Sequence, residues 1–417
     1  MRPPISVKQG MEKLASHSGL IHIGTLLDCT QLKERLQNLN GVHCNDPKFS
    51  HADILFSMVG LISIGKPDYD AIEIFRSKPD FFTKALGISG CPSSPTIRQR
   101  IDLIGQAADS IIREESAALV RSKAPAISPI ETSAGPYIPL DIDVSPFDNS
   151  KTHKEGVSRT YKGYDGYAPI FSYLGTEGYL INLELREGKQ HCQKNTPQFI
   201  DFIIKRNLRR ESRQAWAELA KDVGEQRICR SGKSVWVCKT SVGVKGEKLP
   251  FPIVFEVTER RTKKGQELIF PEIEVDTYWC SVEQLTAQEV IELYHDHGTS
   301  EQFHSEIKSD MDLERLPSGS FTSNSLVLQL GMLTYNMLRI IGQQSLEEAE
   351  LSLLPGSRSK KVSRRRIRTV MQDLIYMAGR LIHTGRRWFI SFGQLNPFAE
   401  LWERIDKRLR SPATVLR

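Results

Sequence analysis

The chain has 417 residues, of which 39% are hydrophobic and 25% are charged, values that exclude a disordered chain and suit a globular protein of two or three domains. Its net charge of +6 is uneven: residues 355–417 hold fifteen Lys or Arg against four Asp or Glu, a local balance of +11 that leaves −5 for the rest. The seven cysteines show no C-x-x-C spacing, which predicts reduced thiols. The absence of a secretory leader predicts a cytoplasmic location. The most apolar run (326–341) is too polar to span a bilayer, so no membrane partner is expected.

Residues 1–121 are expected to be helical, because their apolar residues recur at helical spacing. Arg98 and Arg100 lie near the start of one such helix. The region can dock in a DNA groove or serve only as a packing domain, and the residues leave both open. The stretch 122–137 is rich in Ser, Pro, Ala and Gly, which is typical of a linker.

Strands are predicted from residue 138 onward. Apolar residues of 138–145 alternate with the acids Asp141 and Asp143, which predicts that the acids face away from the strand's buried side. Two further strands up to about residue 188 complete an antiparallel meander. Carboxylates at the end of a buried strand need a partner or a cation, although Asp143 also fits an ordinary strand-end acid.

The middle of the chain is predicted to be rich in strands. A strand runs to about residue 208, a short helix covers 212–221, and alternating residues over 235–278 indicate a β-rich insertion.

Two helix starts follow one another closely. Thr286 and Glu289 form a capping box that starts a helix over 287–294, and Gly298 is expected to end it. Thr299 and Gln302 form a second box, which puts Glu301 in the first turn of a new helix.

The second helix carries an acid, a histidine and a lysine on one side. His304 and Lys308 follow Glu301 at spacings that share one face. This stripe is either a solvated charged surface or a place to hold a metal ion and a phosphate.

The chain closes with a buried helix over 326–341 and a basic tail. Seven of the twelve residues in 357–368 are Lys or Arg, among them Arg364, Arg365 and Arg366. The run is either a solvated face or a surface that contacts several DNA phosphates.

These residues resemble bacterial insertion-sequence transposases of the DDE type. Their signature is Tyr, two residues, Arg, three residues, Glu, six residues, Lys. Tyr294, Glu301 and Lys308 match it in register, and His297 stands where the usual Arg would be. The flanking runs E-Q-F-H-S-E-I-K-S-D-M-D-L-E-R-L-P-S-G and T-Y-N-M-L-R also look like one subgroup of these elements.

The resemblance implies a fold and a division of the chain. The fold is an α/β, RNase H-like mixed sheet with flanking helices, a β-rich insertion and a helical N-terminal domain. The implied parts are a DNA-binding region (1–121), a linker (122–137), the first part of the catalytic core (138–208), the insertion (209–280), the last part of the core (281–345) and a basic C-terminal helical region (346–417).

The resemblance also implies a chemistry. Asp143 and Glu301 match catalytic acids that hold Mg²⁺ or Mn²⁺ for phosphodiester cleavage and strand transfer at terminal inverted repeats. The implied partners are double-stranded DNA and a second copy of the chain. The residues expected to contact DNA are Tyr294, His297, Lys308, Arg364, Arg365 and Arg366.

One part of the pattern is missing. The family has a second Asp at the end of a strand between the meander and the insertion, but 189–201 is too short for the helix, strand and helix needed there. Asp201 and Asp222 lack a strand-end context. The hypothesis is therefore that an internal segment carrying the second Asp is deleted, and the alternative function is a catalytically dead DNA-binding remnant. A structure-specific nuclease on the same core is a third reading.

Overall fold

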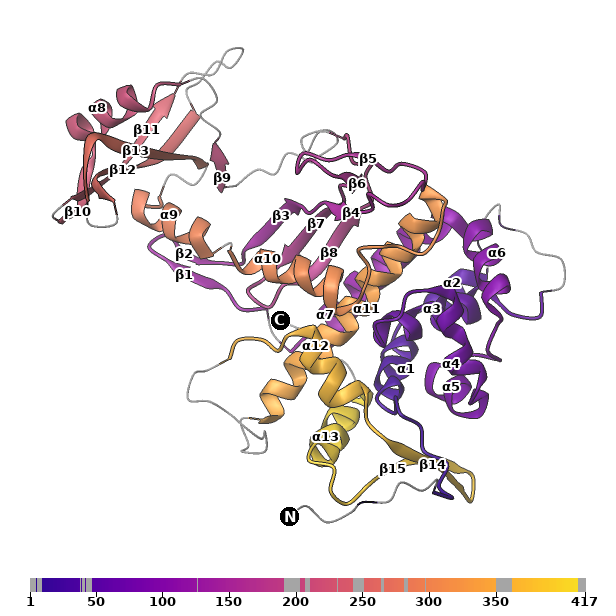
Figure 1. The fold of residues 1–417 in the computed structure, drawn as a ribbon. Helices are drawn as coiled ribbons and strands as arrows, with labels where there is room; N and C mark the ends of the chain where they lie inside the picture. Colours follow the sequence, from indigo (N-terminus) through magenta and orange to yellow (C-terminus); the bar gives the residue numbers. More distant parts are fainter. Residues whose placement is uncertain are drawn as a thin grey trace. The chain divides into compact units, whose positions relative to one another are not determined.

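The computed structural model describes residues 5, 10–37, 39, 42, 47–125, 127–190, 203–206, 211–230, 232–242, 251–263, 266–280, 284–296, 298–349 and 362–411. The fold is mixed α/β, with several sheets and a helical N-terminal region (Figure 1). Two compact units divide the chain: unit 1 comprises Met1–Ser128, Ile138–Cys192 and Phe303–Arg417, and unit 2 comprises Pro129–Tyr137 and Gln193–Gln302. No helix among the described residues is long and apolar enough to cross a membrane.

The N-terminal part of unit 1 is helical, as predicted. Its helices are α1 (Leu20–Asp28), α2 (Leu32–Gln37), α3 (His51–Ser63), α4 (Glu73–Arg76), α5 (Pro79–Leu86), α6 (Ser94–Ile104) and α7 (Asp109–Lys123). Helix α3 begins with a capping box, in which the Asp53 backbone N–H donates to Ser50 Oγ and the Ser50 N–H donates back to the Asp53 carboxylate.

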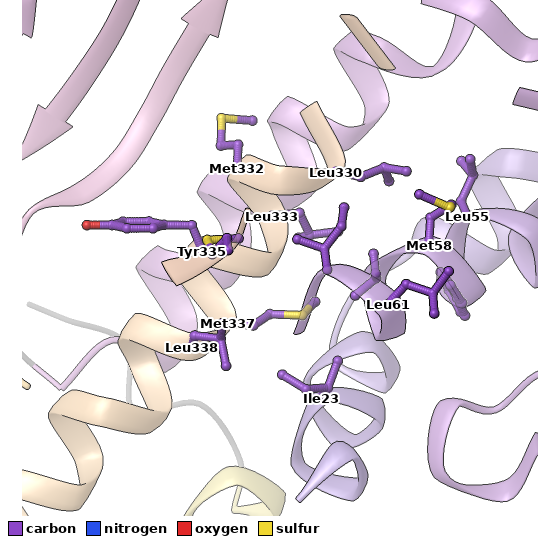
Figure 2. Close-up of a cluster of buried hydrophobic side chains, with 14 of the residues drawn as sticks. Ile23, Leu55, Met58, Leu61, Leu330, Met332, Leu333, Tyr335, Met337 and Leu338 are labelled. Carbon is purple, nitrogen blue, oxygen red and sulfur yellow. The ribbon is translucent and has the colours of Figure 1, made fainter. Parts of the chain in front are cut away.

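The long helix α11 (Phe321–Ala349) forms the centre of unit 1. It contains the predicted buried helix, confirmed and extended at both ends, and every residue of 326–341 is buried. Figure 2 shows Leu330 and Leu333 of α11 among Ile23, Leu55 and Leu61 of α1 and α3. The N-terminal helices and the C-terminal third therefore share one hydrophobic core.

A three-stranded antiparallel sheet packs beside α11. Its strands are β3 (Leu140–Val144), β7 (Ile170–Leu174) and β8 (Tyr179–Glu184), in the order β3-β7-β8. This confirms the predicted pairing of the meander. A second small sheet, with the order β4-β6-β5, comes between β3 and β7 in the chain and contains β4 (Phe147–Asp148), β5 (Ser158–Arg159) and β6 (Asp165–Tyr167).

Strand β3 forms where it was predicted, but burial along it does not alternate, and the predicted orientation of its faces is wrong. Ile138 and Leu140, expected on the buried side, are 52% and 40% exposed. Asp143 instead pairs across the sheet with Phe171, which is fully buried. The aromatic residues of β7 decide which face is covered, because Phe171 and Tyr173 bury far more apolar surface than the short aliphatic residues of β3.

Unit 2 is built on a five-stranded antiparallel sheet with the order β10-β11-β12-β13-β9. Its strands are β9 (Ile203–Arg206), β10 (Glu225–Arg230), β11 (Lys233–Val242), β12 (Phe251–Lys263) and β13 (Gln266–Cys280). The predicted β-rich insertion and the short helix before it, α8 (Arg213–Val223), are confirmed. Strand β9 pairs with β13 and so belongs to this sheet, although the sequence placed it with the strands before it.

Two other segments differ from expectation. The predicted linker contains the end of α7 and a hairpin of β1 (Ile130–Thr132) and β2 (Gly135–Tyr137). The basic C-terminal region, expected to be helical, contains α12 (Ile367–Val370), a π-helical turn (Met371–Ile375), a hairpin of β14 (Gly379–Thr384) and β15 (Arg387–Phe392), and α13 (Ala399–Arg410). Short polar turns with glycine allow both hairpins, and their pairing is not visible in composition alone.

Candidate functional site

The first helix of the signature segment begins as predicted. In α9 (Ala287–Asp296), the Thr286 N–H donates to Glu289 Oε2 over 2.9 Å, and the Glu289 N–H donates to Thr286 Oγ1 over 3.2 Å. Ser133 also donates to Glu289 through both its hydroxyl and its backbone N–H, each over 2.7 Å. These bonds, with the Ser133 hydroxyl first, lower the pKa of Glu289 to about 2.

The second helix forms as predicted but begins at Gly298, which was expected to end the first helix, and so one residue before the predicted cap Thr299. Helix α10 (Gly298–Ser305) carries Glu301 in its first turn, where the helix dipole favours a carboxylate. Glu301 is exposed and His304, one turn on, is buried. Tyr294 lies on α9 with its ring 5.0 Å from the ring of Tyr278. His297 lies outside the described residues.

Asp143, the residue before the last of β3, lies beside His304. Its Oδ2 lies 3.4 Å from His304 Nε2, and its side chain is 47% exposed. Asp143 Oδ1 accepts a 2.7 Å hydrogen bond from the Val144 N–H. On its other side, His304 Nδ1 lies 3.3 Å from the Tyr173 hydroxyl. His304 therefore connects the proposed acid to the buried aromatic face of the sheet.

Lys308 interacts electrostatically with Asp143. It belongs to a π-helical turn (Glu306–Asp310) that continues α10, and its ammonium donates to the Pro146 carbonyl over 2.6 Å. Burial lowers the pKa of Lys308, and the carboxylates of Glu314 and Asp143 oppose this shift. The arrangement brings one half-exposed carboxylate and one partly buried cation together in unit 1.

Sequence reasoning missed a buried ion network under this turn. Glu306 is 1% exposed and pairs with Arg339 of α11, whose side chain is fully buried. The Tyr335 hydroxyl donates to Glu306 Oε2 over 3.1 Å, and Arg364 Nη1 donates to Oε1 over 2.8 Å. Arg339 was the available signal, because a guanidinium inside an apolar helix requires a buried acceptor.

All three arginines predicted to bind DNA make ion pairs within unit 1. Arg364 pairs with Glu306, and Arg365 Nη2 lies 2.9 Å from Asp373. Arg366 Nε donates to Asp310 over 2.8 Å, and this raises the pKa of the guanidinium. Arg364 and Arg365 have side chains only 9% and 8% exposed, whereas Arg366 is 51% exposed. Their role in DNA binding stays a prediction.

The arginines near the start of α6 also make contacts within unit 1. Arg100 is 7% exposed and donates to the Phe49 carbonyl over 3.2 Å. The Arg98 guanidinium lies 5.7 Å from the centre of the Tyr69 ring. Both contacts fit the packing interpretation of residues 1–121 and leave groove docking as a prediction.

The implied metal site is incomplete among the described residues. They contain no group of three or more His, Cys, Asp or Glu side chains that could hold a metal ion. Asp143, in unit 1, and Glu301, in unit 2, are each suitable oxygen ligands. The residues described thus do not fit a two-ion site.

Comparison with known proteins adds no family assignment. No protein-family model matches the chain, and no curated protein matches it.

Proposed function

We propose that this chain is by family a DNA transposase of the insertion-sequence DDE type, with an RNase H-like core, and that it binds duplex DNA at terminal inverted repeats as a homodimer in the cytoplasm. The proposal rests on the contact between Asp143 and the helical segment that contains Lys308. His304 Nε2 lies 3.4 Å from Asp143 Oδ2, and the Lys308 ammonium donates to the carbonyl of Pro146, which follows Asp143 by three residues.

The chain's own residues have distinct tasks in this proposal. Asp143 and Glu301 supply carboxylate oxygens, the ligands that Mg²⁺ or Mn²⁺ prefers. Tyr294 and Lys308 contact the phosphates of the element end, and a cation there offsets the charge of the DNA backbone. His304 holds the Asp143 carboxylate against the sheet.

A second candidate is a DNA-binding remnant without cleavage activity. The unpaired outer edge of β3, among the described residues, favours this candidate. A strand that places another acid beside Asp143 must pair with the outer edge of β3, because β7 occupies the other edge. Within the described residues, no strand pairs with that outer edge. Two carboxylates are too few for a two-ion site, so this chain is expected not to cleave DNA.

Cleavage of the chain's own element end separates the two candidates. The purified full chain is incubated with Mg²⁺ or Mn²⁺ and duplex DNA that flanks its coding sequence, and nicked strands are resolved on a denaturing gel. The variants Asp143→Asn and Glu301→Ala serve as controls. We expect the same background for all three proteins, as the remnant requires.

Metal-dependent nicking that Glu301→Ala abolishes would instead establish an active transposase. Absence of both nicking and duplex binding at low salt would reject both candidates.

A further inference from the structure

The hairpin of β14 and β15 presents arginines at its tip. Thr384 and Arg387 are the last paired residues, so the loop consists of Gly385 and Arg386 alone. Gly385 has φ 58°, the geometry that a type II′ turn requires at its first loop position. The tight turn holds Arg386 and Arg387 next to each other on exposed positions.

Strand register gives the hairpin two different faces. Leu381 and Ile390, paired across the strands, pack against the core of unit 1. The opposite face carries Arg380, Phe389 and Arg387, because side chains alternate along a strand. Arg380 is 51% exposed and Phe389 is 45% exposed. An exposed aromatic ring thus lies between two arginines.

The surroundings of this outer face strengthen its positive charge. No Asp or Glu occurs in the sequence between Asp373 and Glu400. The carboxylate of Glu12 lies 4.0 Å from Arg380, at the outer limit of an ion pair. This contrasts with Arg364 and Arg365, whose charges are buried against acids.

We propose that the outer face of the β14–β15 hairpin, formed by Arg380, Arg386, Arg387 and Phe389, binds the phosphate backbone of duplex DNA. Guanidinium groups pair well with phosphate oxygens, and the major groove of B-DNA admits a two-stranded β-ribbon. The identity of the partner rests on the proposed function. The surface itself rests on the charge and exposure of the hairpin.

Salt-dependent binding tests the hairpin directly. Fluorescence anisotropy of a labelled duplex of arbitrary sequence, about 30 base pairs long, is measured with the full chain at salt concentrations from about 50 to 200 mM, without divalent metal. The test variant is R380Q/R386Q/R387Q. We expect its slope of log affinity against log salt to be shallower by about 2.7, since each lost phosphate contact removes about 0.9.

A matched variant controls for total charge. R113Q/R121Q/K407Q removes the same charge from exposed positions of α7 and α13 in unit 1. We expect it to keep the slope of the unmodified chain. Phe389→Ala is expected to weaken binding without changing the slope, because the ring carries no charge. Thermal melts verify that each variant is folded.

The outcomes distinguish this inference from the proposed function. If the unmodified chain binds duplex DNA and R380Q/R386Q/R387Q binds it with the same slope, the hairpin inference is wrong and the proposed function stands. Loss of binding only to single-stranded DNA would also overturn the inference. If the unmodified chain binds no duplex even at the lowest salt, DNA as a partner is wrong as well.

Discussion

Glu289 and Glu306 lie close together in sequence but are held in different ways. Glu289 lies near the surface of unit 2 and accepts hydrogen bonds from Thr286 and Ser133. Glu306 lies inside unit 1 and is held by Arg339 and Arg364, which come from α11 and the C-terminal tail. Neutral hydroxyl and backbone N–H donors are therefore enough to hold a surface carboxylate, whereas a buried one depends on cations.

The largest expected effect comes from breaking the buried network. Glu306→Ala should lower the free energy of unfolding by about 3–5 kcal/mol, because it leaves Arg339 buried without its carboxylate. Urea denaturation of the full chain measures the loss. Glu301→Ala, at an exposed position of α10, is the control and should change stability by less than about 0.5 kcal/mol.

A double variant tests the cause of that loss. Glu306→Gln combined with Arg339→Met removes both charges, so it should recover part of the stability that Glu306→Gln alone loses. A double variant less stable than the sum of its single variants would contradict the explanation by an unpaired buried charge.

Asp109 extends this contrast because it is a partly buried acid held by a hydroxyl, with Arg113 acting on it only through its charge. Burial raises its pKa to about 6, and a 3.3 Å hydrogen bond from Ser325 Oγ opposes the shift only partly. Its folded pKa therefore exceeds the ordinary value of 3.8. The ionised form penalises folding, so this group favours folding most at a pH below 3.8 and loses that benefit as pH rises through about 6.

Asp109→Asn should therefore stabilise unit 1 by about 1–2 kcal/mol at about pH 8 and have little effect at about pH 4. Denaturation curves at the two pH values measure the difference. Asp80→Asn, on the exposed side of α5, should change stability at neither pH. A destabilised Asp109→Asn protein at the higher pH would show that the carboxylate is needed in its ionised form.

The smallest expected effect belongs to the surface acid. Glu289→Ala removes the capping box of α9 and should cost about 1 kcal/mol in the unfolding of unit 2. The folded pKa of Glu289 is lowered from 4.5 to about 2, so the carboxylate stabilises the fold above pH 4.5 and loses this effect as pH falls through about 2.

A pH series followed by circular dichroism tests this prediction. The acid-induced loss should be smaller in Glu289→Ala than in the unmodified chain. Glu292 lies on the same helix and accepts a side-chain hydrogen bond from Gln288, so Glu292→Ala should behave like the unmodified chain. Equal acid sensitivity of Glu289→Ala and the unmodified chain would mean that other groups control the transition.

The sequence correctly predicted the features that depend on residues a few positions apart in the chain. The Thr286–Glu289 capping box, the position of Glu301 in the first turn of α10 and the burial of 326–341 follow from spacing rules over a few residues. Such rules work because the backbone geometry of one helix turn fixes which side chains meet.

The sequence did not predict what depends on distant partners. The pairing of β9 with β13, the covered face of β3 and the contact of His304 with Asp143 each join segments far apart in the chain. The arginines of the tail illustrate the limit. A dense basic run looks the same whether its charges meet DNA or, as for Arg364 and Arg365, acids of the same unit.

Helix α11 limits how the chain can be divided. Its residues pack against α1, α3 and α7 as well as against β8 and α13, all within one core. A fragment that ends before α11 would expose the apolar sides of the N-terminal helices to water, so we expect such a fragment to aggregate rather than fold. We therefore expect the first third of the chain to fold only when α11 is present, so recombination that exchanged the first third alone would have to bring a matching α11 with it.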